Sequence, residues 1–318
     1  MIRTKSISIV IVNWNSGKQL LDVVSSVALY ANDSVKAVII VDNGSSDNSL
    51  CLIAKKNNLP FELHIIRNVE NVGFGVACNQ GAALASTEYL LFLNPDTRLF
   101  EKSLSVPLAY MENPINKDVA VAGIQLIDEK NRIARSCARF PVLSMFVVQV
   151  LGLNHFLTLR HLNMHMTDWA HDETRFVDHV IGAFYFIRRK VFVQLGGFDE
   201  RFFVYLEDLD LSFRAKENGW RSVYLADVQA FHVGGGTSNQ VKARRMFYSL
   251  RSRILYAFKH FSVLGALVVL LATFLIEPIS RSVLALARLS WSSFKETWQG
   301  YAMLWHWLPQ WLFKGVTR

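Results

Sequence analysis

The stretch Ile7-Ser8-Ile9-Val10-Ile11-Val12-Asn13 decides the fold of this chain. A short run of β-branched residues that ends in polar residues is typical of a buried strand. Similar runs follow, with helix-length amphipathic segments between the early ones. Strands that alternate with helices predict an α/β fold with a mostly parallel central sheet, flanked by helices on both faces. The predicted strands are Ile7–Asn13, Ala37–Asp42, Glu62–Ile66, Tyr89–Leu93 and Val119–Gly123, and the predicted helices are Gly17–Tyr30, Asp47–Asn57 and Gly75–Ala85.

The pattern is less regular in the middle of the chain. Gln125–Arg135 predicts a hairpin that turns at Asp128–Asn131, since these turn residues separate two apolar stretches. Leu143–His171 has no clear period, and we interpret it as an excursion from the sheet. Regular signals return with a predicted strand at Val177–Ile187 and a predicted helix at Leu206–Asn218.

Charge and hydropathy separate a body from a tail. The 318 residues are 51% hydrophobic with a net charge of +8, which excludes a disordered chain and a polytopic membrane protein. Residues 242–318 carry eleven Lys or Arg against Glu277 and Glu296, so the tail holds +9 and the remainder −1. A neutral body with a basic tail indicates anionic lipid or nucleic acid as the partner of the tail.

The tail has the composition of a helical segment at a membrane surface. Val263–Ile276 contains 14 uncharged residues, short of the roughly 20 that a spanning helix needs. Five of the eight tryptophans lie between Trp291 and Trp311, and tryptophan with basic residues is typical of interfacial helices. We therefore predict two domains, 1–240 and a membrane-associated tail, 241–318. The alternative is an appendage that packs on the body or on another subunit. Nucleic acid is disfavoured because the tail contains no recognisable nucleic-acid module.

Cysteine usage and the first residues predict the compartment. Cys51, Cys78 and Cys137 show no paired spacing, which indicates a reducing compartment and argues against a structural zinc site. Met1–Ser6 is short and polar and runs directly into the first strand, so we expect no signal peptide. The predicted location is the cytoplasmic face of the plasma membrane.

Polar residues collect where the predicted strands end. The three clusters are Asn13–Asn15, Asp42–Asp47 and Asn94–Asp96. Each one alone is compatible with an ordinary turn or a helix N-cap. Ligands of open α/β sheets bind beyond the carboxyl ends of the strands, so three clusters at such ends favour a ligand site.

A glycine-containing stretch from Asn71 to Gly81 follows the third strand. Glycines such as Gly73 at a loop-to-helix junction allow a backbone to approach phosphate. The stretch lacks the Gly-Lys-Ser/Thr of a nucleoside triphosphate loop. Its position after the third strand also argues against dinucleotide binding.

The second half of the chain supplies candidate catalytic and metal-binding groups. Glu207, Asp208 and Asp210 begin a predicted helix, where acids can simply complement the helix dipole. Their apolar surroundings would raise a carboxyl pKa and suit a general base. His232 precedes three glycines that we interpret as a mobile flap. With Asp96 it offers one oxygen and one nitrogen, a set that suits Mn²⁺ or Mg²⁺ on phosphate oxygens.

Together these motifs resemble glycosyltransferase family 2, with its Rossmann-like GT-A fold, and above all its bacterial rhamnosyltransferase-like branch. The resemblance covers residues 6–238, and five motifs occur in the order of the family. It implies donor-binding roles for Val12, Asn13, Asp42, Asn71, Gly73, Asn79 and Asn94.

The same resemblance implies the catalytic roles. Asp96 matches the last residue of the family's metal motif, in which Asn94 replaces a frequent aspartate, and His232 matches the C-terminal metal ligand. Asp208 matches the general base, and Glu207 is the second candidate or orients the acceptor.

These roles predict an inverting, metal-dependent transfer of one sugar, since the Gln-x-x-Arg-Trp motif of processive synthases is absent. The expected donor is a dTDP- or UDP-sugar, with dTDP-rhamnose favoured, and the expected acceptor is a lipid-linked glycan of a surface polysaccharide. One alternative is a polyprenyl phosphate acceptor. Another is a non-catalytic scaffold, which the joint presence of Asp96, Asp208 and His232 disfavours.

Overall fold

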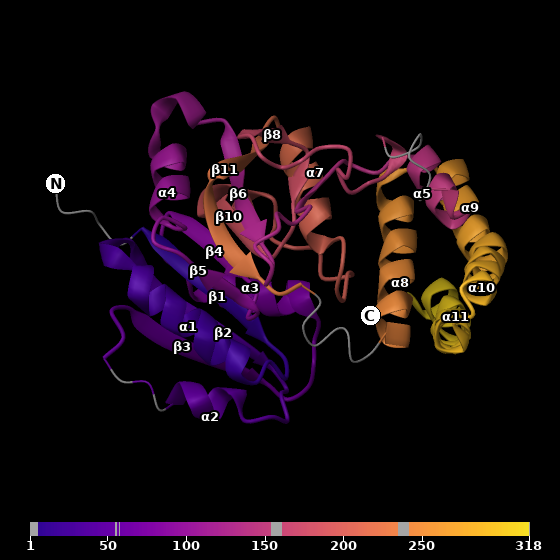
Figure 1. Cartoon of the computed structure of the whole chain (residues 1–318), viewed down its shortest axis with the longest axis horizontal. Coiled ribbons are helices and arrows are strands. Elements are labelled where there is room, and N and C mark those ends of the chain that lie inside the picture. Colours follow the sequence, from indigo (N-terminus) through magenta and orange to yellow (C-terminus); the bar gives the residue numbers. More distant parts are fainter. Residues whose placement is uncertain (1–5, 55, 57, 154–160, 235–241, 318) are drawn as a thin grey trace.

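The computed structural model describes residues 6–54, 56, 58–153, 161–234 and 242–317. One mixed sheet forms its centre, with strand order β3-β2-β1-β4-β10-β6-β11-β5 and β8 paired to β11. Helices cover the sheet, and a separate helical layer stands at one end of the molecule (Figure 1). The strands are β1 Ile7–Asn13, β2 Val35–Asn43, β3 Glu62–Asn68, β4 Tyr89–Leu93, β5 Thr97–Leu99, β6 Val119–Ile127, β7 Cys137–Ala138, β8 Arg175–Val177, β9 His179–Val180, β10 Phe184–Arg188 and β11 Arg221–His232.

The helices of the body are α1 Lys18–Tyr30, α2 Ser49–Ala54, α3 Phe74–Leu84, α4 Ser105–Glu112, α5 Leu143–Val150, α6 Arg189–Gln194 and α7 Glu207–Glu217, with 3₁₀ turns at Asn32–Ser34 and Pro114–Asn116. Every residue of β1 is buried, because both faces of this strand are covered. The parallel register pairs Asn13 with Asp42, so the ends of β1 and β2 meet at one edge of the sheet.

The first half of the sheet is parallel, as predicted, and the second half is mixed. β10 runs antiparallel to both β4 and β6, and β11 runs antiparallel to the short β5. The single strand predicted over Val177–Ile187 is wrong, because the chain leaves the ladder between β9 and β10. Gly182 lies in this interruption, and its N–H donates to the carboxylate of Asp208 at 2.7 Å instead of to a strand.

The tail consists of α8 Lys242–His260, α9 Val263–Leu271, a π-turn Ala272–Ile276, α10 Glu277–Ala287 and α11 Trp291–Lys314. The uncharged run does end at Ile276, but the inference that this segment is shorter than a spanning helix is wrong, because the helix continues through the π-turn and Glu277 to Ala287. By length and composition this 25-residue helix is able to cross a membrane, with a mean hydropathy of 2.2 over its most apolar window. Glu277 is accommodated within it because Arg253 and Arg281 pair with its carboxylate.

The tail shares a hydrophobic core with the body. Phe202 and Leu209 of the body pack in one cluster with Leu250 and Ile254 of α8 and Tyr301 of α11. The division at residue 240 remains a prediction, since packing is continuous across it.

Candidate active site

The ends of β1 and β2 form a small polar cluster around Asn13. Its side-chain Nδ2 donates to Asp42 Oδ1 at 2.6 Å, to Ser49 Oγ at 2.9 Å and to Ser45 Oγ at 3.1 Å. Its Oδ1 is buried without a hydrogen-bond partner, and Val12 beside it is also buried. A buried acceptor without a partner is costly, and the donor-binding role of Asn13 stays a prediction.

The backbone conformation at position 73 and its contact with a neighbouring carbonyl group require glycine. Its φ is +94°, and a Cβ at this position would lie 2.6 Å from the carbonyl oxygen of Phe203. The same oxygen accepts a hydrogen bond from Phe74 N at 2.6 Å, and Asn71 Oδ1 accepts from Gly73 N at 3.0 Å. The turn therefore docks the start of α3 on the loop before α7.

Asn79 holds that loop from the side of α3. Its Nδ2 donates to Phe198 O at 2.9 Å and to Glu200 Oε1 at 3.2 Å, and its Oδ1 accepts from Phe198 N at 2.9 Å. Both ends of the amide are thus engaged by protein. Its predicted contact with the donor stays a prediction, and these bonds add a positioning role, since they hold the loop before α7.

Asp96 and His232 meet, although 135 residues lie between them in the chain. The pairing of β11 with β5 sets His232 opposite Thr97, and Asp96 Oδ1 lies 3.3 Å from His232 Nε2. Both side chains are about one-tenth exposed. The predicted flap after His232 includes residues 235–238, which lie outside the described residues.

This pair fits a divalent ion. Two adjacent ligands of an octahedral ion with bonds of about 2.1 Å lie about 3 Å apart, close to the observed oxygen-to-nitrogen distance. A carboxylate oxygen and an imidazole nitrogen are ligands that Mn²⁺ accepts. Among the described residues, no group of three or more His, Cys, Asp or Glu is placed to hold a metal.

Two neighbouring carboxyl groups at the start of α7 have opposite ionisation. Burial and the negative charge of Asp208 raise the pKa of Glu207 well above its usual range, and Glu207 Oε2 has no hydrogen-bond partner. Burial alone would also raise the pKa of Asp208. His179 and the N–H groups of Gly182 and Leu209 outweigh it and hold this pKa below its usual range. The raised carboxyl pKa that the sequence predicted for the base is therefore found at Glu207 and not at Asp208, because the N–H groups and His179 favour the charged form of Asp208.

A cavity of about 350 Å³ lies beside the predicted base and the predicted metal ligand His232. Glu207, Asp208, His232 and Asn94 line it, so the predicted metal ligand and the predicted base face one space. Phe146 and Gln149 of α5 and Ser249 of α8 form its other end, toward the helical layer. A cavity of this size accommodates a sugar ring.

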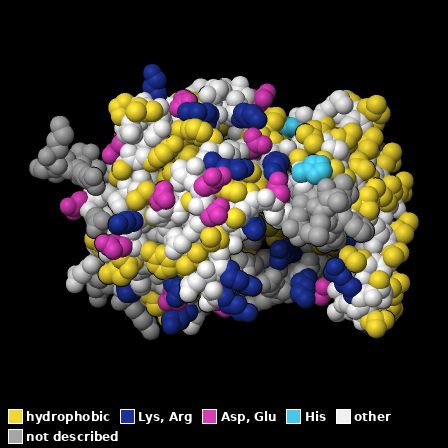
Figure 2. All heavy atoms as spheres, turned by 45° about the horizontal axis from the view of Figure 1, so that its top comes forward, with side chains coloured by type: hydrophobic (Ala, Val, Ile, Leu, Met, Phe, Trp, Pro, Cys, Tyr) yellow, Lys and Arg dark blue, Asp and Glu magenta, His cyan; other side chains and the backbone are white. Residues whose placement is uncertain are grey.

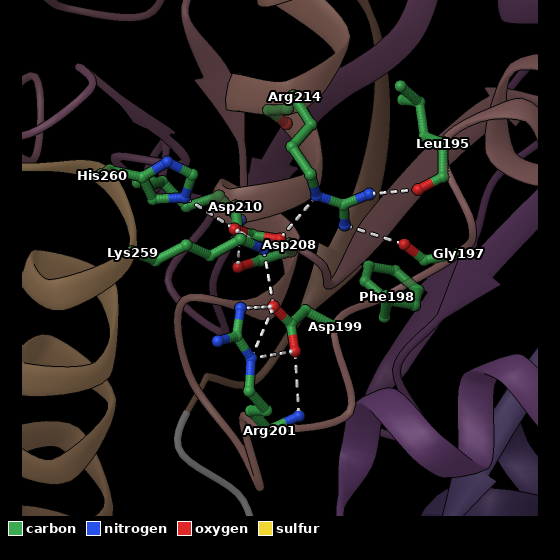
Figure 3. Close-up of polar contacts among 12 residues, drawn as sticks. Leu195, Gly197, Phe198, Asp199, Arg201, Asp208, Asp210, Arg214, Lys259 and His260 are labelled. Atoms are coloured by element: carbon green, nitrogen blue, oxygen red, sulfur yellow. Dashed lines mark hydrogen bonds and ion pairs between the residues drawn. The ribbon is translucent and has the colours of Figure 1, made fainter.

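A charged network around Asp210 was not predicted from the sequence. Asp210, which is fully buried, accepts from Arg214 at 2.8 Å, Lys259 at 2.6 Å and His260 at 2.7 Å. Lys259 also contacts Asp199 at 2.6 Å (Figure 3). Lys259 and His260 end α8, so the tail is anchored on α7 through Asp210. No local pattern in the sequence indicates this contact, because Lys259 and His260 lie about 50 residues from Asp210 in the chain.

A mixed α/β sheet flanked by helices is the architecture of the GT-A class of glycosyltransferases. A mannosyltransferase from Pyrobaculum calidifontis, solved with GDP-Man and Mn²⁺, matches 99% of this chain and 84% of its own chain with a TM-score of 0.55 at 17% identity. A sequence model of glycosyl transferase family 2 matches residues 8–195, more than half of the chain. The chain belongs to this family, which confirms the predicted fold and family.

Named relatives come from the rhamnosyltransferase-like branch, as the sequence predicted. Rhamnosyltransferase WbbL of Escherichia coli K12 is 29% identical over 54% of this chain, and the match spans 62% of the length of that relative. The N-acetylglucosaminyl-diphospho-decaprenol L-rhamnosyltransferase of Mycobacterium tuberculosis is 24% identical over 72% of this chain and 76% of its own length.

Proposed function

We propose that this protein transfers one sugar, with inversion at the anomeric carbon, from a nucleotide donor to a lipid-linked glycan. The observation that carries the proposal is the shared cavity of Asp208, Glu207 and His232, in which Asp208 is held ionised. An ionised carboxylate that faces a cavity is able to accept a proton from an acceptor hydroxyl.

In the proposed step, an acceptor hydroxyl attacks the anomeric carbon from the face opposite the nucleoside diphosphate. Asp208 takes the hydroxyl proton as the new carbon–oxygen bond forms, and the bond to the diphosphate breaks with its electron pair on the diphosphate oxygen. Such general base catalysis contributes about 10²–10⁴ in rate. A divalent ion on Asp96 and His232 would supply positive charge to the leaving diphosphate. Neutral Glu207 has an oxygen free to hydrogen-bond an acceptor or donor hydroxyl.

The favoured donor is dTDP-rhamnose. Two of the named relatives transfer rhamnose by name, and one of them acts by name on a diphospho-decaprenol carrier. Asn13, with its unpartnered Oδ1, and Asp42 would hold the nucleoside at the ends of β1 and β2. The far end of the cavity points to α5 and α8, which is consistent with an acceptor that arrives from a lipid surface.

The helical layer would bind the cytoplasmic face of the plasma membrane without crossing it. Large apolar side chains gather over the end of the molecule that α9 and α10 form in Figure 1 (Figure 2). They repeat every third or fourth residue, which places them on one helix face. Members of this stripe are Val263, Leu264, Leu267, Leu271, Leu275, Ile279, Val283 and Leu286, all 40–74% exposed. A one-sided stripe beside a buried Glu277 favours a helix that lies in the interface.

The test is a donor screen with purified protein and a lipid-linked acceptor. dTDP-rhamnose, UDP-sugars and GDP-mannose are compared with Mn²⁺, with Mg²⁺ and with chelator, and the anomeric configuration of the product is read by NMR. We expect transfer from one dTDP- or UDP-sugar, inverted configuration and loss of activity with chelator. A retained configuration, or transfer that resists the chelator, would refute the mechanism.

A further inference from the structure

A chain of buried polar side chains leads from Asp208 into the core. His179, which is 2% exposed, places Nε2 at 3.5 Å from Asp208 Oδ2. Its Nδ1 lies 2.9 Å from Ser212 Oγ, and Ser212 Oγ lies 2.9 Å from the hydroxyl oxygen of Tyr185. Ser212 and Tyr185 are buried too. Four side chains from three elements thus lie in one line that ends at the carboxylate facing the cavity.

The chemistry of these four side chains determines which atom donates and which accepts in each hydrogen bond. A neutral imidazole has one N–H and one bare nitrogen, and an ionised carboxylate only accepts. In the neutral form of His179, Nε2 carries the proton that faces Asp208, and Nδ1 accepts from the Ser212 hydroxyl. Ser212 in turn is able to accept from Tyr185, whose proton is retained because burial raises the pKa of the phenol. The network selects one histidine tautomer.

The line also determines which part of Asp208 remains available. A carboxylate has about four acceptor positions. Gly182 N donates to Oδ2 at 2.7 Å, Leu209 N donates to Oδ1 at 2.8 Å, and His179 approaches Oδ2. Three positions are thereby used, and one is left for an acceptor hydroxyl. Gly182 permits this arrangement, since a Cβ there would lie 3.0 Å from Oδ2.

We propose that His179 is a positioning residue for the general base: with Ser212 and Tyr185 behind it, it orients Asp208 and keeps its carboxylate ionised. The role of Asp208 as base belongs to the proposed function, so this inference rests on it. Other titratable groups face the same pair and do not replace His179, because none of them is hydrogen-bonded to Asp208. They are Glu207 on α7, Cys78 on α3, and His165, which lines the cavity.

The first measurement is the pKa of Asp208 by NMR of ¹³C-labelled aspartate, with the Asp208 signal identified by its absence in Asp208→Asn. His179→Phe keeps a planar ring but removes the donor, and we expect it to raise the pKa of Asp208 by about 1–2 units, the scale of a hydrogen bond to a charge. His179→Gln retains an N–H donor and should recover most of this shift. Ser212→Ala releases the tautomer and should give a smaller shift in the same direction.

The second measurement is the pH dependence of kcat/KM at saturating metal. A base with a raised pKa is protonated at higher pH, so the acidic limb of His179→Phe should move upward by the same amount. We expect kcat to fall roughly 10- to 100-fold with the donor KM unchanged. The control is His171→Asn, which removes another buried histidine that neither lines the cavity nor contacts Asp208, at a left-handed position that asparagine tolerates, and it should leave the acidic limb in place.

An unshifted pKa of Asp208 in folded His179→Phe, checked by thermal unfolding, would overturn the inference. So would a loss of activity that is equal at every pH, since that is the signature of a packing defect. Failure of the proposed function looks different, because Asp208→Asn would then retain activity while the NMR shift in His179→Phe persisted.

Discussion

Asp208 and Asp210 lie two residues apart on α7 and should respond oppositely to the same substitution. Asp208→Asn removes a proton acceptor that faces the cavity, whereas Asp210→Asn removes the negative charge at the centre of a buried cationic cluster. The first change should abolish transfer and leave the fold intact. The second should destabilise the fold and leave the chemistry of the folded fraction largely unchanged.

The size of the second effect follows from the partners of Asp210. Its carboxylate is fully buried and pairs with Arg214, Lys259 and His260. Removal of one partner from a buried ion pair costs about 3–5 kcal/mol, because the remaining charges stay buried and unpaired. Lys259 keeps Asp199, and Arg214 keeps two backbone carbonyls, so we expect about 3 kcal/mol.

The pH dependence gives an independent signature. Burial opposes ionisation of Asp210, but His260, Arg214 and Lys259 outweigh it and lower its pKa below the unfolded value. A lowered pKa contributes stability above the unfolded pKa of about 3.9, and this contribution is lost as the pH falls through the folded pKa. The stability difference between wild type and Asp210→Asn should therefore be full at pH 7 and shrink below about pH 4.

The assay combines urea unfolding with initial rates on the same preparations. Asp208→Asn should lose only about 1–2 kcal/mol of unfolding free energy: the N–H groups of Gly182 and Leu209 bind different oxygens of Asp208, and asparagine keeps one acceptor oxygen for one of them. Its rate should fall about 10²–10⁴-fold. The reasoning is refuted if Asp210→Asn loses transfer at unchanged stability, or if Asp208→Asn turns over within a few-fold of wild type.

Three further predictions concern the metal, the buried arginines and the membrane. Asp96→Ala should abolish transfer and weaken binding of nucleoside diphosphate with Mn²⁺ in calorimetry, while His232→Ala should reduce turnover less, since water is able to replace a peripheral ligand. Arg251→Met should not lower the free energy of unfolding in urea, because Nε and Nη2 of this buried side chain lack partners and burial lowers its pKa to about 10. Arg253→Met should cost about 3 kcal/mol, because it separates an ion pair of 2.5 Å with Glu277; equal effects of the two would contradict this. Leu264→Glu, at a side chain 74% exposed, should reduce sedimentation with anionic vesicles without changing the melting temperature, and unchanged sedimentation would argue against the stripe.

Two of the strands that are buried on both faces could be predicted at their observed bounds, whereas β6 was predicted only to Gly123 and β10 was merged with its neighbours. β1 and β4 are continuous apolar runs for that reason, and both were found within their observed bounds. The strand predicted over Val177–Ile187 failed because its apolar pattern continues through a break. At the break, the N–H of Gly182 binds Asp208, which lies 26 residues further along the chain. No local pattern in the sequence indicates this contact.

In the candidate site, too, residues at strand ends could be predicted, and contacts between distant parts of the chain could not. Asp96 and His232 could be proposed from their positions at strand ends, and the structure brings them together through the pairing of β5 with β11. Asn79 was assigned to the donor by the family resemblance, and its contacts with Phe198 and Glu200, about 120 residues away in the chain, could not be predicted from a local pattern. His179 was missed because a single histidine in an apolar segment gives no local signal of its partners.

The tail and the body share one hydrophobic core, and this determines how the membrane proposal has to be tested. Leu250 and Ile254 of α8 are buried between the body and the later helices, and Tyr301 and Leu304 of α11 belong to the same cluster. A deletion after His260 would expose this apolar surface, and it would also leave Arg253 without its partner Glu277. The truncated chain would then be prone to aggregation, and its sedimentation would say little about lipid. Single substitutions in the exposed stripe keep both the core and the ion pair, so their effect on vesicle binding reports on the membrane contact alone.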